Sequence, residues 1–222
     1  MSDPPVPRDA CRLLQLSVVL IGVYVVLDIV AQLLPPHYNP ISQAESNLAV
    51  GPYGYVMTVN FVVRGVLSLA FLLGLTRATS MGRRSPLGIG LLGVWAIGAF
   101  VLAVSPTDVG SGPVTLHGTV HLLTALVAFV AAAVGEILLS LRFGDDPRLA
   151  ELRTPALAVS ALAFLSMVVL YLVDARPRIA SEAFGLIERV FLAFVLLWML
   201  VVALYLLRSD RSATTASSPA QG

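Results

Sequence analysis

Charge is scarce in this chain. Only 12% of its 222 residues are charged, against about one quarter in a typical soluble domain. The formal net charge is +1, so no basic stripe is available to neutralise phosphates, which argues against a nucleic-acid partner. Lysine is absent and all 14 basic residues are arginine, which we attribute to genome composition rather than to chemistry.

Cysteine and histidine are nearly as sparse. The single cysteine, Cys11, excludes an internal disulfide and a cysteine metal cluster. The chain has three histidines, and the two predicted to share a helix lie one turn apart, so they cannot ligate opposite faces of one haem. We therefore predict no resident cofactor, and zinc or another divalent metal is the one alternative that the histidines leave open.

Hydrophobic residues are abundant instead. They make up 57% of the chain, and the mean hydropathy is +0.87. A membrane-spanning helix needs roughly 20 mostly apolar residues, and six such stretches occur between clusters of proline and glycine. Their length and lack of alternating polarity predict an all-α, polytopic six-transmembrane-helix bundle. The predicted spans are residues 13–34, 54–75, 86–104, 116–141, 155–173 and 185–207.

Arginine placement predicts how this bundle is oriented. Arginines flank both chain ends and fill the second and fourth loops, whereas the opposite loops hold only Arg176 and Arg178. The positive-inside rule then places both termini in the cytoplasm, and the compact loops suggest a bacterial plasma membrane. We expect a cytoplasmic segment at 1–12, the transmembrane domain at 13–207 and a disordered cytoplasmic tail at 208–222.

The longest external loop spans residues 35–53. Within it, Ser42 and Glu45 have the spacing of a helix capping box. We therefore predict a short helix there, lying at the membrane interface.

Polar residues inside the predicted spans gather at one depth. An ionisable group at the bilayer centre costs about 2.5–3.5 kcal/mol on insertion scales, so it usually faces a bundle interior or a wet cavity. Nearly all such groups here fall in the outer half of the membrane. We predict an outward-facing polar pocket that binds a small anionic or lipid-headgroup ligand, with membrane lipid as the expected partner. The proposed ligand-binding residues are Asp28, Asn60, Arg64, Asp108, Glu188 and Arg189.

Two interpretations of Arg64 stay open. Asn60 and Arg64 lie one helical turn apart and share a face. In the first interpretation Arg64 forms an ion pair with Asp28 or Glu188 that stabilises the packing of the helices, and the protein is a non-catalytic membrane scaffold. In the second, Arg64 binds an anionic group in a cavity, in a binding protein or a transporter.

His117 and His121 define a third hypothesis. They too are one turn apart, so both imidazoles can point at one metal ion. Asp108 or Glu188 would supply the third ligand, and the protein would be an intramembrane metal-dependent enzyme acting on lipid. The alternative is a polar pair near the headgroups with no metal.

Glu136 is the exception in depth, near the predicted cytoplasmic end of the fourth span. We expect its side chain to snorkel towards water and to pair with Arg142 or Arg77, rather than to relay protons.

Three motifs in this chain resemble a known family. The first runs from Tyr38-Asn39-Pro40-Ile41-Ser42 to Asn60 and Arg64, the second from Ser105-Pro106-Thr107-Asp108 to His117-Gly118-Thr119-Val120-His121, and the third is Glu188-Arg189-Val190. Together they resemble the domain-of-unknown-function 998 family of prokaryotic integral membrane proteins, over about residues 13–207. The family pattern often has an aromatic residue where Ser105 stands here. The resemblance implies a multi-helix membrane protein, and it implies no established activity, substrate or cofactor.

Overall fold

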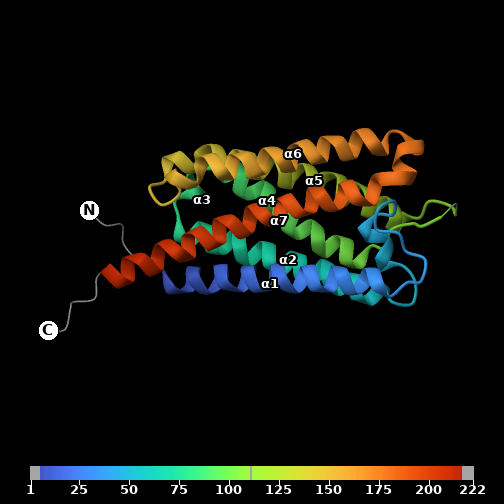
Figure 1. Cartoon of the computed structure of the whole chain (residues 1–222), viewed down its shortest axis with the longest axis horizontal. Helices are drawn as coiled ribbons and strands as arrows, with labels where there is room; N and C mark the ends of the chain where they lie inside the picture. The colour runs from blue at the N-terminus through green and yellow to red at the C-terminus, as the bar shows by residue number, and fades with distance from the viewer. Residues whose placement is uncertain (1–5, 111, 217–222) are drawn as a thin grey trace.

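The computed structural model describes residues 6–110 and 112–216, which fold mainly into long helices (Figure 1). Six helical segments are long and apolar enough to cross a membrane, and no strand occurs among the residues described. The predicted all-α, multi-pass architecture is therefore confirmed. The long helices are α1 (Arg8–Leu33), α2 (Gly54–Ala78), α4 (Pro86–Val104), α5 (Leu116–Arg142), α6 (Arg153–Asp174) and α7 (Pro177–Ala216).

Local sequence signals explain where several helices begin and end. Pro86 opens α4, where its missing N–H costs nothing, and this helix has the predicted bounds. Thr115 is the N-cap of α5, and its hydroxyl accepts a hydrogen bond from the Gly118 amide at 3.0 Å. Helix α7 continues to Ala216, beyond the predicted end at 207, and residues 217–222 of the predicted tail lie outside the described part of the chain.

Four short helical elements connect the long ones. They are η1 (Glu45–Ala49), α3 (Met81–Arg84), η2 (Phe143–Asp145) and η3 (Ala150–Leu152). The short helix predicted in the α1–α2 loop is present as η1, but the predicted capping box is wrong. Ala44 is the N-cap of η1 and no side chain caps it, because the Glu45 carboxylate instead accepts a hydrogen bond from Tyr24.

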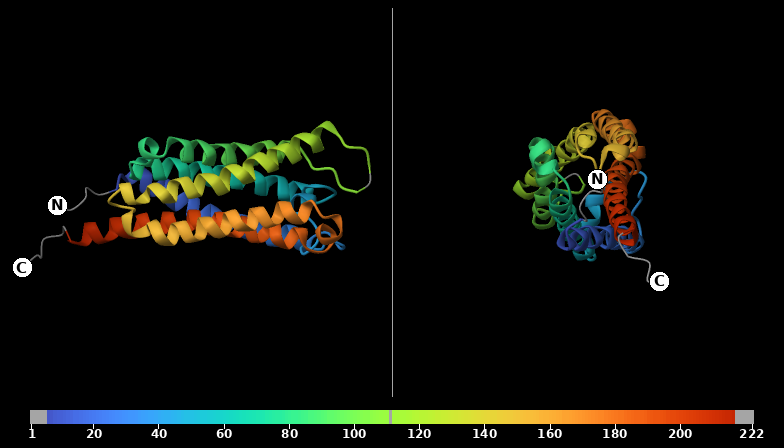
Figure 2. Two further views of the ribbon diagram at one scale, coloured as in Figure 1. Left: turned by 90° about the horizontal axis from the view of Figure 1, so that it is seen from above. Right: turned by 90° about the vertical axis from the view of Figure 1, so that its left-hand side faces the viewer.

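The six long helices form a closed ring (Figure 2). Each packs against its neighbours in chain order, and α7 closes the ring against α1. Along the α4–α5 seam the backbones approach closely, since a Cβ atom on Gly135 would lie 3.1 Å from Leu91 Cβ and 3.2 Å from the Gly88 carbonyl oxygen. Such contact between small residues favours helix association in lipid.

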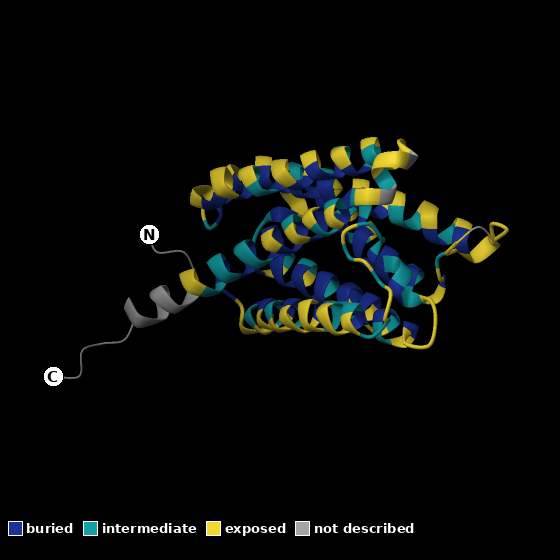
Figure 3. Ribbon diagram, turned by 45° about the vertical axis from the view of Figure 1, so that its right-hand side comes forward, coloured by how far each residue is buried: buried dark blue, intermediate teal, exposed yellow. Residues whose placement is uncertain are grey.

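Hydrophobic residues cover both the inside and the outside of the ring. Buried residues face the interior, with Phe71, Trp95 and Trp198 fully enclosed, and exposed residues follow the outward faces of the helices (Figure 3). Many of the exposed side chains are large and apolar, such as Val19 and Leu122. A surface of this kind is suited to a lipid solvent rather than to water.

The two ends of the bundle differ. Helix α1 begins and α7 ends at the same end, which we call the proximal end (Figure 1). The opposite end, called distal here, carries the α1–α2 loop with η1, the α4–α5 connection and the α6–α7 connection. The distal end corresponds to the predicted outer side, where the polar residues were expected to meet.

Candidate functional site

A cavity of about 400 Å³ lies in the distal half, lined by residues of α2, α4, α5, α6, α7 and η1. Its size falls within the range of small-molecule sites. We call it the distal cavity. Its polar lining is Glu45, Ser46, Asn47, Arg64, Thr107, His121, Tyr171, Asp174 and Glu188. Its apolar lining includes Phe61, Leu102, Leu122, Leu123, Leu126, Phe129, Leu170 and Phe184.

Arg64 is the buried cation of the distal cavity. It is 2% exposed, and its Nε and Nη2 atoms have no hydrogen-bond partner. Its guanidinium carbon lies 4.6 Å from the centroid of the Trp95 ring and 5.1 Å from that of Phe61. No ion pair joins Arg64 to an acidic residue within 6–110 and 112–216, so of the two interpretations the one that pairs it with Asp28 or Glu188 is wrong. The aromatic faces stabilise the cation and leave its N–H groups available.

Two carboxylates face the same cavity from other elements. Tyr24 OH in α1 donates to Glu45 Oε1 at 2.5 Å, and the Glu45 amide donates to Glu188 Oε2 at 2.6 Å. Both glutamates are buried, at 2% and 6% exposure. The half-buried Asp28 accepts from Gln32 at 2.6 Å and also interacts with Glu45. A chain of acidic groups therefore runs from α1 through η1 to α7, although Asp28 itself does not line the cavity.

His121 is buried in the cavity wall, whereas His117 is exposed. The His121 Nδ1 atom lies 2.6 Å from the carbonyl oxygen of Ser105. Because that oxygen can only accept, Nδ1 carries a proton, and Nε2 of the neutral ring bears the lone pair. Among the described residues no group of three or more His, Cys, Asp or Glu side chains could hold a metal ion. The metal hypothesis therefore finds no third ligand there.

Residues 44–47 of the α1–α2 loop line the distal cavity, and we call residues 40–47 its roof. Arg189 holds this roof in place. Its Nη1 donates to the carbonyl oxygens of Pro40, Gln43 and Gly185 at 3.0, 3.3 and 3.0 Å. Its Nη2 donates to the Tyr38 hydroxyl at 2.5 Å, and burial raises the pKa of Tyr38 to about 12. A Cβ atom on Gly185 would lie 2.1 Å from the Gln43 oxygen, so only glycine fits beneath this loop. Arg189 thus positions the roof and does not line the cavity.

Asp108 likewise organises a loop. Its carboxylate accepts from the Thr115 amide and hydroxyl, both at 2.8 Å, and Thr115 in turn caps α5. These hydrogen bonds, the backbone one first, lower the pKa of Asp108. The side chain is exposed and outside the cavity lining, whereas its neighbour Thr107 belongs to it.

Asn60 is buried one turn from Arg64. Its Nδ2 lies 4.0 Å from Met57 Sδ, its Oδ1 has no partner, and it is not in the cavity lining. Of the six residues proposed as ligands, the structure brings only Arg64 and Glu188 to the cavity. Glu45 was missed, because its spacing from Ser42 indicated a capping role.

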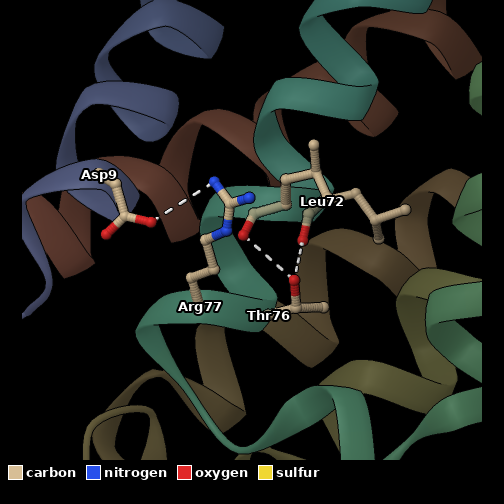
Figure 4. Close-up of polar contacts among 5 residues, drawn as sticks. Asp9, Leu72, Thr76 and Arg77 are labelled. Atoms are coloured by element: carbon tan, nitrogen blue, oxygen red, sulfur yellow. Dashed lines mark hydrogen bonds and ion pairs between the residues drawn. The ribbon is translucent and has the colours of Figure 1, made fainter.

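Glu136 lies towards the proximal end of α5 and is fully buried. Neither of its carboxyl oxygens has a hydrogen-bond partner. The predicted pairing with Arg142 or Arg77 is wrong, because these arginines pair with residues at the surface. Arg142 lies 3.4 Å from Asp145, and Arg77 lies 3.5 Å from Asp9 (Figure 4).

Comparison with known proteins assigns the chain to a family. Neither the curated proteins nor the solved structures gave a match. A family model described as "Protein of unknown function (DUF998)" matches residues 18–205. That range takes in parts of all six long helices and every residue that lines the distal cavity. Because the match covers most of the sequence and agrees with the three motifs that suggested it, this chain belongs to the DUF998 family.

Proposed function

We propose that this protein binds the headgroup of a membrane lipid in the distal cavity. The observation that carries the proposal is the state of Arg64, which is buried beside a cavity with two N–H-bearing atoms unpartnered. A buried charge without hydrogen bonds is costly, so such a residue usually has a ligand or partner. The guanidinium pairs bidentately with carboxylate or phosphate oxygens, and in most membrane lipids the headgroup carries a phosphate.

The apolar wall of the cavity supports a lipid over a soluble anion. Leu122, Leu123 and Leu126 of α5 line the distal cavity, and they are also 66%, 56% and 43% exposed. The cavity lining therefore continues onto the outer surface of the helix, where acyl chains would lie. A ligand with a polar head and an apolar tail matches both parts of this surface.

We also propose that the protein lies in a plasma membrane with its proximal end in the cytoplasm. The α2–α4 and α5–α6 connections at that end are rich in arginine, as the positive-inside rule requires. In a Cys11→Ser background, Gly112→Cys at the distal end should react with an impermeant maleimide on intact cells. The exposed Gly82→Cys at the proximal end should react only after permeabilisation, and the reverse pattern would contradict this orientation.

Removal of the buried cation tests lipid binding. Full-length protein in detergent would be titrated with a phospholipid and followed by native mass spectrometry. Arg64→Met should weaken binding at least about tenfold, since a hydrogen bond to a charged group contributes about 1.5–3 kcal/mol. The matched control is Arg77→Met, which removes a cation from the same helix but only breaks an exposed ion pair.

Two outcomes decide this proposal. Unchanged binding by Arg64→Met would overturn it, as would an equal loss in Arg77→Met. If Arg64→Met does not fold, Arg64→Lys is the second variant, because it keeps the positive charge but lacks the planar, paired N–H donors of the guanidinium. Lipid binding should still fall in this variant, while the helical circular dichroism signal is retained.

A further inference from the structure

Acidic groups outnumber basic groups around the polar end of the distal cavity. Arg64 is the basic residue in the lining, and Glu45 and Glu188 face the same space from η1 and α7. A ligand bearing only negative charge would gain one favourable contact and meet two carboxylates. Like charges brought together in a low-dielectric site repel strongly, so the lining is poorly matched to a simple anion.

Neither neighbouring arginine neutralises these carboxylates by direct pairing. Arg64 rests on Trp95 and Phe61 and forms no ion pair, as far as the described residues show. Arg189 directs its Nη atoms at loop carbonyls and a tyrosine hydroxyl. The cation and the two carboxylates thus face one cavity as separate recognition groups.

We propose that the distal cavity selects a zwitterionic phospholipid whose headgroup carries a protonated amine. The phosphate would bind the Arg64 guanidinium, and the ammonium would donate to Glu45 and Glu188. This inference rests on the proposed function and names the lipid class. An anionic lipid would leave Glu45 and Glu188 without partners, whereas an amine-bearing zwitterionic lipid gives Arg64 and these two glutamates partners of opposite sign.

The surrounding groups fit this arrangement. The Tyr24 hydroxyl and the Glu45 amide each occupy one oxygen of a carboxylate, which fixes both acids at the roof of the cavity. In its neutral form, with Nδ1 protonated, His121 offers Nε2 as a further acceptor for an N–H group. Asp174 also lies in the lining, at the distal end of α6, and adds a further acidic group.

Lipids that differ only in their headgroup test the inference. Full-length protein would be titrated with phosphatidylethanolamine, phosphatidylglycerol and phosphatidylcholine of identical acyl chains. We expect the ethanolamine lipid to bind at least about tenfold more tightly than the other two, because only it offers both a cation and N–H donors. Equal or tighter binding of the glycerol lipid would overturn the inference, and so would equal binding of the choline lipid.

A charge-neutral variant assigns the selectivity to the cavity. Glu188→Gln keeps an oxygen that can accept from the Glu45 amide but loses the negative charge, so the preference for ethanolamine over glycerol lipid should fall at least fivefold. Glu182→Gln, an exposed acid on the same helix, is the control and should keep the preference. Should Glu188→Gln fail to fold, Glu45→Gln serves, since its amide oxygen can still accept from Tyr24. A retained preference in the variant that folds would overturn the inference.

Failure of this inference differs from failure of the proposed function. Binding that depends on Arg64 but favours the glycerol lipid rejects the amine-bearing class and keeps lipid binding. Binding that is insensitive to Arg64→Met rejects both.

Discussion

In the distal half of the bundle, buried Arg64, Glu45 and Glu188 share a cavity, and the carboxylates have hydroxyl and amide donors. In the proximal half, Glu136 is buried with neither oxygen partnered, and it is not part of that cavity. Both halves bury ionisable groups, but the distal group lies beside a cavity of about 400 Å³ that Glu136 does not line. Burial of a charge therefore does not by itself mark a site, whereas burial beside a cavity with matching polar groups does.

The close contact between Gly185 and the backbone at Gln43 should give the largest effect on stability. Gly185→Ala forces a Cβ atom against the Gln43 carbonyl, which is backbone and must move, so we expect a loss of about 3 kcal/mol in the free energy of unfolding. Because the displaced loop carries Glu45, lipid binding should fall as well. Gly135→Ala crowds the α4–α5 seam against Leu91 and should lower stability only.

Unfolding in detergent and lipid titration would measure both quantities. Gly22→Ala is the control, because a Cβ atom there meets nothing within 4 Å. If Gly135→Ala also weakened lipid binding, the conclusion that lipid binding depends on the distal half alone would be contradicted.

Replacement of Glu136 should have the opposite sign. A buried polar group without a partner costs about 1–3 kcal/mol, so Glu136→Leu should raise the free energy of unfolding by about 1–2 kcal/mol and leave lipid binding unchanged. Unfolding by denaturant in detergent, compared with the wild type, measures the gain. A loss of stability instead would mean that Glu136 has a partner and belongs to a proximal polar site.

The helices of this fold were predictable because each carries its own signal. Every predicted span overlaps a long helix, and proline or threonine marks several of the ends. In lipid a helix satisfies its own backbone hydrogen bonds, so hydrophobic length is enough to predict a span. The depth of the polar residues along the bundle axis could be predicted by the same reasoning, because it depends only on the position of each residue along its helix.

Partners across the ring were not predictable in this way. One of the two interpretations paired Arg64 with an acid, but Arg64 packs on Trp95, a contact between α2 and α4 that sequence spacing cannot indicate. Asp108 and Arg189 were predicted to bind a ligand. In the structure their side chains form hydrogen bonds that fix loops. Glu45 reaches the cavity only because Tyr24 of α1 and Glu188 of α7 fix η1 over it. Each of these differences concerns rotation about a helix axis or the path of a loop, and both are set by packing.

Two tryptophans give a smaller and sharper test. Trp95 and Trp198 are both fully buried, and each donates its Nε1–H to a serine hydroxyl, at 3.1 Å to Ser68 and 2.9 Å to Ser140. Either substitution by phenylalanine removes that hydrogen bond, and each should cost about 1 kcal/mol of stability. Only Trp95 lies against Arg64, so only Trp95→Phe should also weaken lipid binding, by severalfold. A similar loss of binding in Trp198→Phe would mean that the aromatic contact does not position the cation.

The smallest effect concerns the exposed loop that precedes α5. Hydrogen bonds from Thr115 lower the pKa of Asp108 below its ordinary value of 3.8, so its contribution to stability is present above that value and is lost as the pH falls through the lower folded-state pKa. Asp108→Asn should therefore be less stable than the wild type at pH 6, and the difference should vanish as the pH falls below 3.8. Thermal unfolding in detergent from pH 6 downwards measures this. In a Thr115→Val background the difference should shrink at every pH above 3.8, because one of the two donors is gone. A stability difference between the wild type and Asp108→Asn that does not change with pH would mean that the loop depends on the shape of this side chain and not on its charge.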